Sequence, residues 1–143
     1  KARLRMMTLY QISASTSGIV VGTGNKIEDF GVGFYTKYGD GGVDISPIAD
    51  CTKTQVWAMG KELGILEEIQ MAEPTDGLWS DGRTDTDQLG MSYKEIEHLM
   101  TRPDEPMYDK YLAIRKKNLH KMKPIPVCKF DGKDTLDTDQ KKT

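Results

Sequence analysis

The sequence predicts an α/β fold in which a parallel sheet is flanked by helices, and three observations support this prediction. Residues 18–22 form a short, glycine-bounded run of Ile and Val that is apolar without alternating, as in a strand buried on both faces. Residues 43–46 alternate like a second short strand and are closed by Pro47. Segments with helix start and stop signals lie before, between and after these two. Such alternation of elements is typical of an α/β domain.

The first two helices follow from composition and capping signals. Residues 1–16 lack Gly and Pro and are rich in helix formers, so we expect a helix that ends near residues 15–18. Thr52 is followed by Gln55 three positions later, which is a capping-box pattern for a second helix. Gly64 lies where a helix C-terminal cap belongs.

The second half of the chain combines a long polar segment with two further helices. Residues 73–90 are polar and rich in turn formers, which predicts a long loop. Ser92 and Glu95 form another capping box, and a last helix is expected from Pro106 to about His120.

Length and charge set limits on organisation and partners. The 143 residues suit one domain or a piece of a larger one, with residues 1–130 folded and residues 131–143 a mobile tail. Because the chain starts at Lys1, a preceding segment is expected. The formal net charge is −2 and no RNA-module signature occurs, so a nucleic-acid partner is not expected.

Membrane and secretory classes are also not expected. The longest aliphatic run has only three residues, against the roughly 20 that a membrane helix needs. No secretory signal is recognisable. Two cysteines, Cys51 and Cys128, lie far apart without a disulfide framework, which favours reduced thiols and a cytoplasmic location.

The turn after the first predicted strand is the best candidate for ligand binding. Ligands of open α/β sheets gather at the carboxyl ends of strands, where Gly22-Thr23-Gly24 lies. Ile27 stands where a dinucleotide fingerprint needs its third glycine, and no Walker A loop occurs. These glycines serve either close backbone packing or the approach of a ligand.

Carboxylates and lysines are more promising than histidines. Neither His98 nor His120 has zinc-type spacing to a second ligand, so zinc is not expected. The acids of residues 73–87 could bind Mg²⁺ beside phosphate oxygens, and Glu28 is better placed to do so. By position alone, however, a helix-start acid is the more common role for Glu28. Lysines beside glycine-rich turns suit phosphate binding, and each also fits an ordinary surface role: Lys26, Lys37 and Lys53.

Three strings together resemble the carboxyl-terminal half of the ammonia-dependent NAD⁺ synthetases: GIVVGTGNKIED, TKYGDGGVDISPIADCTKTQVWAMGKELGI and PTDGLWSDGRTDTDQLG. KARLRM at the start and LHK near the end fit the same family in the same order. The resemblance implies a Rossmann-like adenine-nucleotide α-hydrolase fold. It also implies a homodimer that amidates deamido-NAD⁺ with ammonia, using ATP and Mg²⁺.

Site residues are implied one by one by the same resemblance. Thr23, Lys53 and Thr75 match ATP contacts, and Glu28 matches a Mg²⁺ ligand, which reverses the preference from position alone. The deamido-NAD⁺ contacts are matched by Arg3, Lys37, Asp44, His120 and Lys121. Because these last residues span nearly the whole chain, we expect two subunits to share that site, with Lys37 and Lys121 on opposite chains.

One family motif, the SGGxDS pyrophosphatase loop, does not occur in these 143 residues. We therefore expect a fragment that is inactive alone. Two alternatives stay open: another adenylating ATP-pyrophosphatase, and a non-catalytic nucleotide-binding or dimerisation module.

Overall fold

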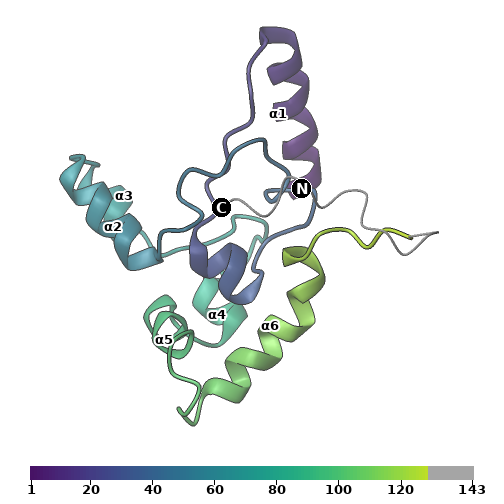
Figure 1. The fold of residues 1–143 in the computed structure, drawn as a ribbon. Helices are drawn as coiled ribbons and strands as arrows, with labels where there is room; N and C mark the ends of the chain where they lie inside the picture. The colour runs from purple at the N-terminus through teal and green to yellow at the C-terminus, as the bar shows by residue number, and fades with distance from the viewer. Residues whose placement is uncertain (129–143) are drawn as a thin grey trace.

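The computed structural model describes residues 1–128, which form a set of helices joined by long connections (Figure 1). The predicted tail, residues 131–143, lies outside the described residues. In order along the chain, the elements are α1 (Ala2–Thr16), the π-helix η1 (Ile27–Val32), α2 (Lys53–Glu62), α3 (Glu67–Met71), α4 (Asp85–Leu89), α5 (Tyr93–Leu99) and α6 (Tyr108–Met122).

Three of the described helices, α2, α4 and α5, begin at a side-chain cap. Both predicted capping boxes are present, with Thr52 at the start of α2 and Ser92 at the start of α5. A third one, formed by Thr84 and Asp87, starts α4 inside the segment predicted as one long loop, so that prediction was wrong over the last residues of the segment. An aspartate replaces the Glu or Gln that the capping-box pattern requires, which explains why the pattern did not identify it.

The predicted strands lie side by side, but the expected sheet does not form among the described residues. Val21 and Ile45 make an isolated parallel bridge, and Gly22 N donates to Ile45 O at 2.7 Å. Val21 is 52% exposed and Ile45 is 45% exposed, although the first segment was predicted to be buried on both faces. Two strands with no further neighbour are too few for a stable sheet. The bridge is parallel, as predicted, but the predicted sheet is not present among residues 1–128.

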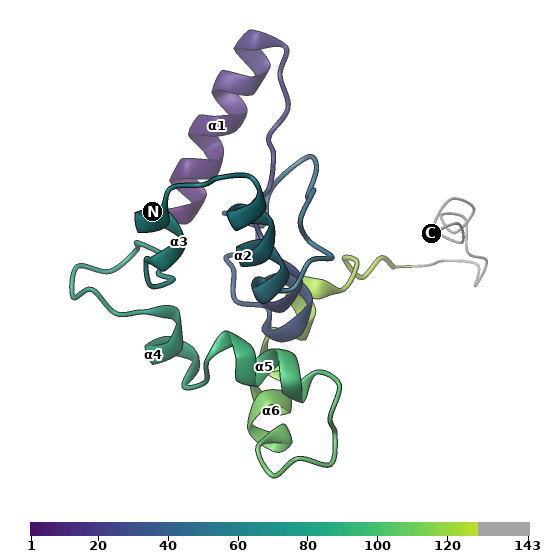
Figure 2. The same ribbon diagram turned by 90° about the vertical axis from the view of Figure 1, so that its left-hand side faces the viewer.

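The hydrophobic core lies at one end of the molecule, between η1, α5 and α6. Its centre includes Ile27 and Val32 of η1, Ile96 of α5 and Tyr111 of α6, all at most 4% exposed. In both views α1 lies at the opposite end from α5 and α6 (Figures 1 and 2), and α1 buries none of its residues. The core thus includes Ile27 and Val32 of η1, the helix that carries Glu28.

The helices described within residues 1–128 do not reach the combined length and hydropathy that a membrane crossing requires.

Candidate functional site

The turn after residues 18–22 is held by a side chain that sequence reasoning missed, Asn25. Asn25 is 2% exposed, and its Oδ1 accepts hydrogen bonds from Ile27 N at 2.9 Å and Glu28 N at 3.2 Å. In return, Glu28 Oε2 accepts from Asn25 N at 3.3 Å. This reciprocal arrangement is that of a capping box, and the N-x-x-E spacing could have revealed it. Glu28 is therefore fixed in orientation at the start of η1, a helix type frequent at functional sites.

Glu28 faces Lys53, the first residue of α2. Lys53 Nζ donates to Glu28 Oε1 at 3.0 Å, and the two side chains are only 18% and 17% exposed. The neighbouring Lys26 turns away and pairs with Asp50 at 2.9 Å, where both side chains are far more exposed. Of these two lysines, Lys53 alone is directed at Glu28.

Tyr93 and Asp85 complete the surroundings of Glu28. The Tyr93 hydroxyl lies 2.8 Å from Glu28 Oε1 and 2.6 Å from Asp85 Oδ2. A tyrosine hydroxyl has one proton, so one of the two carboxyl groups must itself be protonated for both contacts to be hydrogen bonds. Burial raises the pKa of Asp85, with the charge of Glu28 acting in the same direction. Burial thus favours the protonated form of Asp85, and with that form the Tyr93 hydroxyl can donate to Glu28 while accepting from Asp85.

The donor set around Glu28 fits one kind of metal ion. Within residues 1–128 no group of three or more ligating side chains could enclose a metal. Mg²⁺ commonly takes only one or two carboxylates and completes its shell with phosphate oxygens and water. Oδ1 of the 6% exposed Asp85 also lacks a hydrogen-bond partner. Glu28 therefore suits a Mg²⁺ ion that arrives with a nucleotide.

A second group of predicted residues meets at the carboxyl-terminal end of α6. Lys37 Nζ donates to His120 O at 2.9 Å, and Lys121 Nζ donates to Tyr35 O at 2.7 Å. Arg3 Nε donates to Lys37 O at 3.3 Å. Four of the five residues matched to deamido-NAD⁺ therefore lie together within one chain. The structure removes the reason for expecting Lys37 and Lys121 on opposite subunits.

The remaining predicted residues are not part of either group. Asp44 Oδ2 accepts from Val20 N at 2.7 Å and its Oδ1 from the Tyr10 hydroxyl at 3.1 Å, which links residues 43–46 to α1. Thr75 is exposed on the loop before α4, and its Oγ1 accepts from Gly77 N at 3.2 Å. The structure thus brings neither Asp44 nor Thr75 against the other predicted residues.

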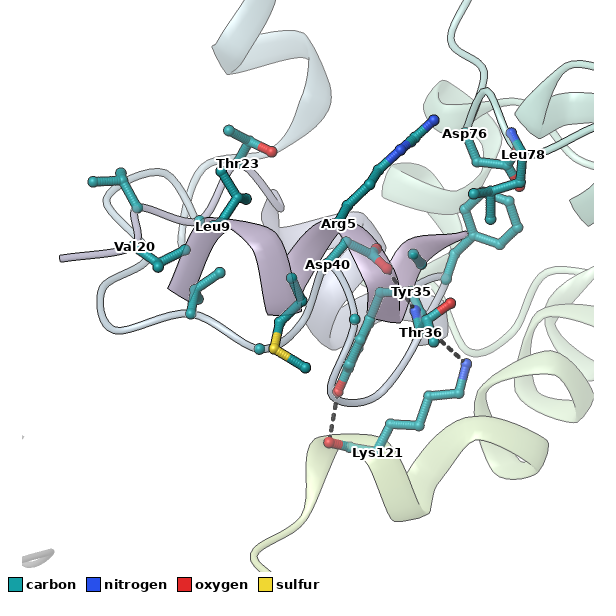
Figure 3. A pocket seen from close by; sticks show the side chains of 18 residues that line it. Arg5, Leu9, Val20, Thr23, Tyr35, Thr36, Asp40, Asp76, Leu78 and Lys121 are labelled. Carbon is teal, nitrogen blue, oxygen red and sulfur yellow. Dashed lines mark hydrogen bonds between the residues drawn. The ribbon is translucent and has the colours of Figure 1, made fainter. Parts of the chain in front are cut away.

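A cavity of about 440 Å³ lies between α1, the turn at residues 35–42 and the end of α6 (Figure 3). Burial lowers the pKa of Lys121, which lines the cavity together with Asp40. Glu28 and Lys53 lie outside its wall. The polar side chains that line it are Arg5, Thr23, Thr36, Asp40, Asp76 and Lys121, with the hydroxyl of Tyr35. The cavity therefore joins Thr23, matched to ATP, with Lys121, matched to deamido-NAD⁺.

Asp29 is a titratable group beside the strand-end turn that the sequence did not single out. Burial raises its pKa to about 6, and the nearby charges of Glu28 and Asp40 act in the same direction. The carboxylate packs so closely on Gly24 that a Cβ there would collide with it. Gly24 is thus packed by a side chain, whereas close backbone packing, one of the two interpretations of these glycines, is found at Gly22, where an added Cβ would lie 3.1 Å from Ile45 O.

Comparisons with known proteins point to one family. The family model described as NAD synthase matches residues 1–130. A protein of Carboxydothermus hydrogenoformans named NH(3)-dependent NAD(+) synthetase is 42% identical over 128 residues, which cover 88% of this chain and 51% of that protein. One with the same name from Methanococcoides burtonii is 49% identical over 100 residues, covering 70% of this chain and 37% of that protein.

Solved structures give the same result. An NMN synthetase from Francisella tularensis matches with a TM-score of 0.83 and 35% identity, covering 90% of this chain and 54% of that one. An NH3-dependent NAD synthetase from Campylobacter jejuni matches with a TM-score of 0.63 and 27% identity, covering 90% and 52%. The chain spans about half the length of the curated relatives that it matches. The family match over nearly the whole chain, with the resemblance in its motifs, assigns this chain to the NAD synthase family.

Proposed function

We propose that this chain is the carboxyl-terminal part of a ligase that makes NAD⁺ by amidating deamido-NAD⁺ with ammonia at the expense of ATP. The observation that carries the proposal is the pair formed by Glu28 and Lys53. It sets one cation and one anion side by side, and Glu28 closely follows the turn that contains Thr23. Relatives named NH(3)-dependent NAD(+) synthetase support the reaction.

The chemistry explains why ATP is needed. A carboxylate is a poor acyl donor, so its oxygen attacks the α-phosphorus of ATP and pyrophosphate leaves. Ammonia then attacks the carbonyl carbon of the acyl-adenylate, and the C–O bond to AMP breaks. Nitrogen loses a proton, and the amide of NAD⁺ remains. The protein's main contribution to such a reaction is positioning and neutralisation of charge.

Each residue matched to ATP or Mg²⁺ has a role that suits its chemical type. Lys53 would donate to phosphate oxygens, since a compact ammonium suits a phosphate. Glu28 would hold Mg²⁺, which when bound neutralises charge on the phosphates of ATP. Hydroxyls of Thr23 and Thr75 would bind the nucleotide. The exposed position of Thr75 requires its loop to move toward ATP in this proposal.

The binding site for deamido-NAD⁺ would be formed near the carboxyl-terminal end of α6. Arg3, Lys37 and Lys121 offer cations to the pyrophosphate and carboxylate of deamido-NAD⁺. His120 lies in the same group, through its backbone oxygen in the present structure. Asp44 would accept from ribose hydroxyls, after releasing the hydroxyl of Tyr10. A ligand with several negative charges is thus matched to the basic end of the described chain.

Three further features belong to the proposal. The exposed Val21 and Ile45 support a parallel sheet of the adenine-nucleotide α-hydrolase type, completed by other strands of a longer protein. The protein is proposed to act as a homodimer. Free Cys51 and Cys128 support a cytoplasmic location.

A second substrate is favoured by one observation. The solved structure with a TM-score of 0.83 is named an NMN synthetase. In this alternative the chain would take part in the same ligation on a mononucleotide, and the cations near α6 would meet one phosphate in place of a pyrophosphate.

An assay of the complete protein tests both candidates. It is supplied with ATP, Mg²⁺ and ammonia, and with either deamido-NAD⁺ or nicotinate mononucleotide. Formation of NAD⁺, AMP and pyrophosphate in equal amounts supports the main proposal, and turnover of the mononucleotide alone supports the alternative. Release of ADP and phosphate, or no turnover of either substrate, contradicts both.

A further inference from the structure

Helix α5 contacts both elements that carry the Glu28–Lys53 pair, although it supplies neither residue. It packs on η1, which carries Glu28, and on α2, which begins with Lys53. Two of its side chains make these connections, Tyr93 and Glu97. They are four positions apart and therefore lie on the same face of the helix.

Tyr93 contacts the carboxylate of Glu28. Its hydroxyl lies 2.8 Å from Glu28 Oε1, the same oxygen that accepts from Lys53 Nζ. The Tyr93 ring also lies under the ammonium group, 4.7 Å from Lys53 Nζ to the ring centroid. At 4% exposure this side chain cannot reorient without disturbing the core. Tyr93 therefore contacts both members of the pair from a rigid position.

Glu97 accepts hydrogen bonds from the first turn of α2. Its Oε1 accepts from Thr54 N at 2.9 Å, and its Oε2 accepts from Thr54 Oγ1 at 2.7 Å. Thr54 directly follows Lys53, so both atoms that Glu97 holds belong to the turn that presents the lysine. A carboxylate is also favourable beside the unsatisfied N–H groups at a helix start. Glu97 thus anchors the backbone that carries Lys53.

We propose that Tyr93 and Glu97 are positioning residues that align Glu28 and Lys53 for the metal and phosphates of ATP. This inference rests on the function proposed for the pair. Both act through other residues, Tyr93 through Glu28 and Lys53, and Glu97 through Thr54. Tyr93 orients the carboxylate oxygen of Glu28, and Glu97 fixes the start of α2. Because both belong to α5, this helix holds Glu28 and Lys53 in a fixed relative position. Residues that orient a metal ligand commonly contribute about 10- to 100-fold to metal affinity.

The test for Tyr93 uses metal binding in the complete protein, without turnover. Mn²⁺ is titrated by electron paramagnetic resonance with ATP present and no second substrate. Tyr93→Phe keeps the ring beneath Lys53 but removes the hydroxyl, and should weaken Mn²⁺ binding by about tenfold or more. Tyr111→Phe is the matched control, because Tyr111 is also 4% exposed and belongs to the same core. Equal Mn²⁺ affinities of the two variants would overturn the role of Tyr93.

The test for Glu97 uses rescue. Glu97→Ala frees the start of α2 and should raise the KM for ATP by about tenfold with a smaller change in kcat. Glu97→Gln can still accept from Thr54 N and donate to Thr54 Oγ1, and should restore most of the loss. Unchanged KM in the Ala variant, or no rescue by Gln, would contradict the proposal.

Lys53→Ala separates the failure of this inference from the failure of the proposed function. If Lys53→Ala does not affect ATP use, the function assigned to the pair is wrong. If Lys53→Ala impairs ATP use while Tyr93→Phe and Glu97→Ala behave as wild type, only the positioning role is wrong. Thermal unfolding of each variant, compared with Tyr111→Phe, identifies losses that come from a damaged core.

Discussion

Glu28 Oε1 lies 3.0 Å from Lys53 Nζ, although 25 residues separate the two along the chain. Each partner is presented by a capped helix start, Glu28 by the turn around Asn25 and Lys53 by the Thr52 cap. Because a capped start has a defined backbone, this anion and cation meet in a defined geometry.

Glu28→Gln should raise the Mg²⁺ concentration for half-maximal rate by at least about tenfold in the complete protein, since a neutral amide is a weaker ligand for a hard cation. Glu95→Gln is the matched control, because Glu95 is the capping-box acid of α5 in the same way that Glu28 closes the turn at Asn25. Rate is measured against Mg²⁺ concentration. If both variants shift the curve equally, Glu28 is only a helix-start acid.

Asp29→Asn should stabilise the protein at neutral pH. The folded pKa of Asp29 is raised from 3.8 to about 6, so its ionisation opposes folding, and stability falls as pH rises from about 4 through 6. Allowing for solvent screening of this half-buried group, the variant should gain about 1–2 kcal/mol at pH 7.5. The gain should vanish below about pH 4. Denaturant unfolding at several pH values measures it, and a pH-independent difference would contradict the assignment.

Gly33→Ala should destabilise the fold by about 2 kcal/mol or more, through a left-handed backbone and a steric clash together. Gly33 has φ +67°, and an added Cβ would lie 2.6 Å from Asn118 Cβ of α6. Gly64 has the same φ with no atom within 4 Å, so Gly64→Ala should cost only about 1 kcal/mol. Equal losses in denaturant unfolding would show that η1 and α6 adjust to the added methyl group.

Lys37→Ala and Lys121→Ala subunits of the complete protein should fail to restore activity when mixed. Both residues lie at the end of α6 within one chain, so each subunit of a mixed dimer keeps one damaged site. Activity is measured after subunit exchange is demonstrated with labelled chains. Recovery toward half of the wild-type rate would show that the two residues serve one site from opposite subunits.

Local signals predicted α1, α2, α5 and α6, but not the five-residue helices α3 and α4. The capping boxes at Thr52 and Ser92 depend on residues three positions apart, so the sequence reveals them directly. The sheet depends on neighbours that two short segments cannot supply, which left Val21 and Ile45 exposed. Local pattern therefore predicts where elements begin more reliably than what they pack against.

The residues of the candidate site were likewise predicted only in part. Glu28 and Lys53 were named from the turn and the resemblance, and the structure brings them together. Tyr93 was missed because its contact with Glu28 spans 65 residues and leaves no local pattern. Asp85 was considered only among the acids of residues 73–87, because its link to Glu28 runs through Tyr93. Contacts of this kind are fixed by packing of α5 on η1.

ATP dependence of two lysine variants tests the central claim most directly. Lys53 and Lys26 both pair with carboxylates at about the same distance, 3.0 Å and 2.9 Å, but only Lys53 faces Glu28 in a half-buried setting. In the complete protein, Lys53→Ala should lower kcat/KM for ATP by about 10- to 150-fold, the value of a charge-assisted bond to phosphate. Lys26→Ala should change it by less than about twofold, as for an exposed ion pair. Equal effects of the two substitutions, or an unchanged Lys53→Ala, would contradict the assignment of the Glu28–Lys53 pair to ATP.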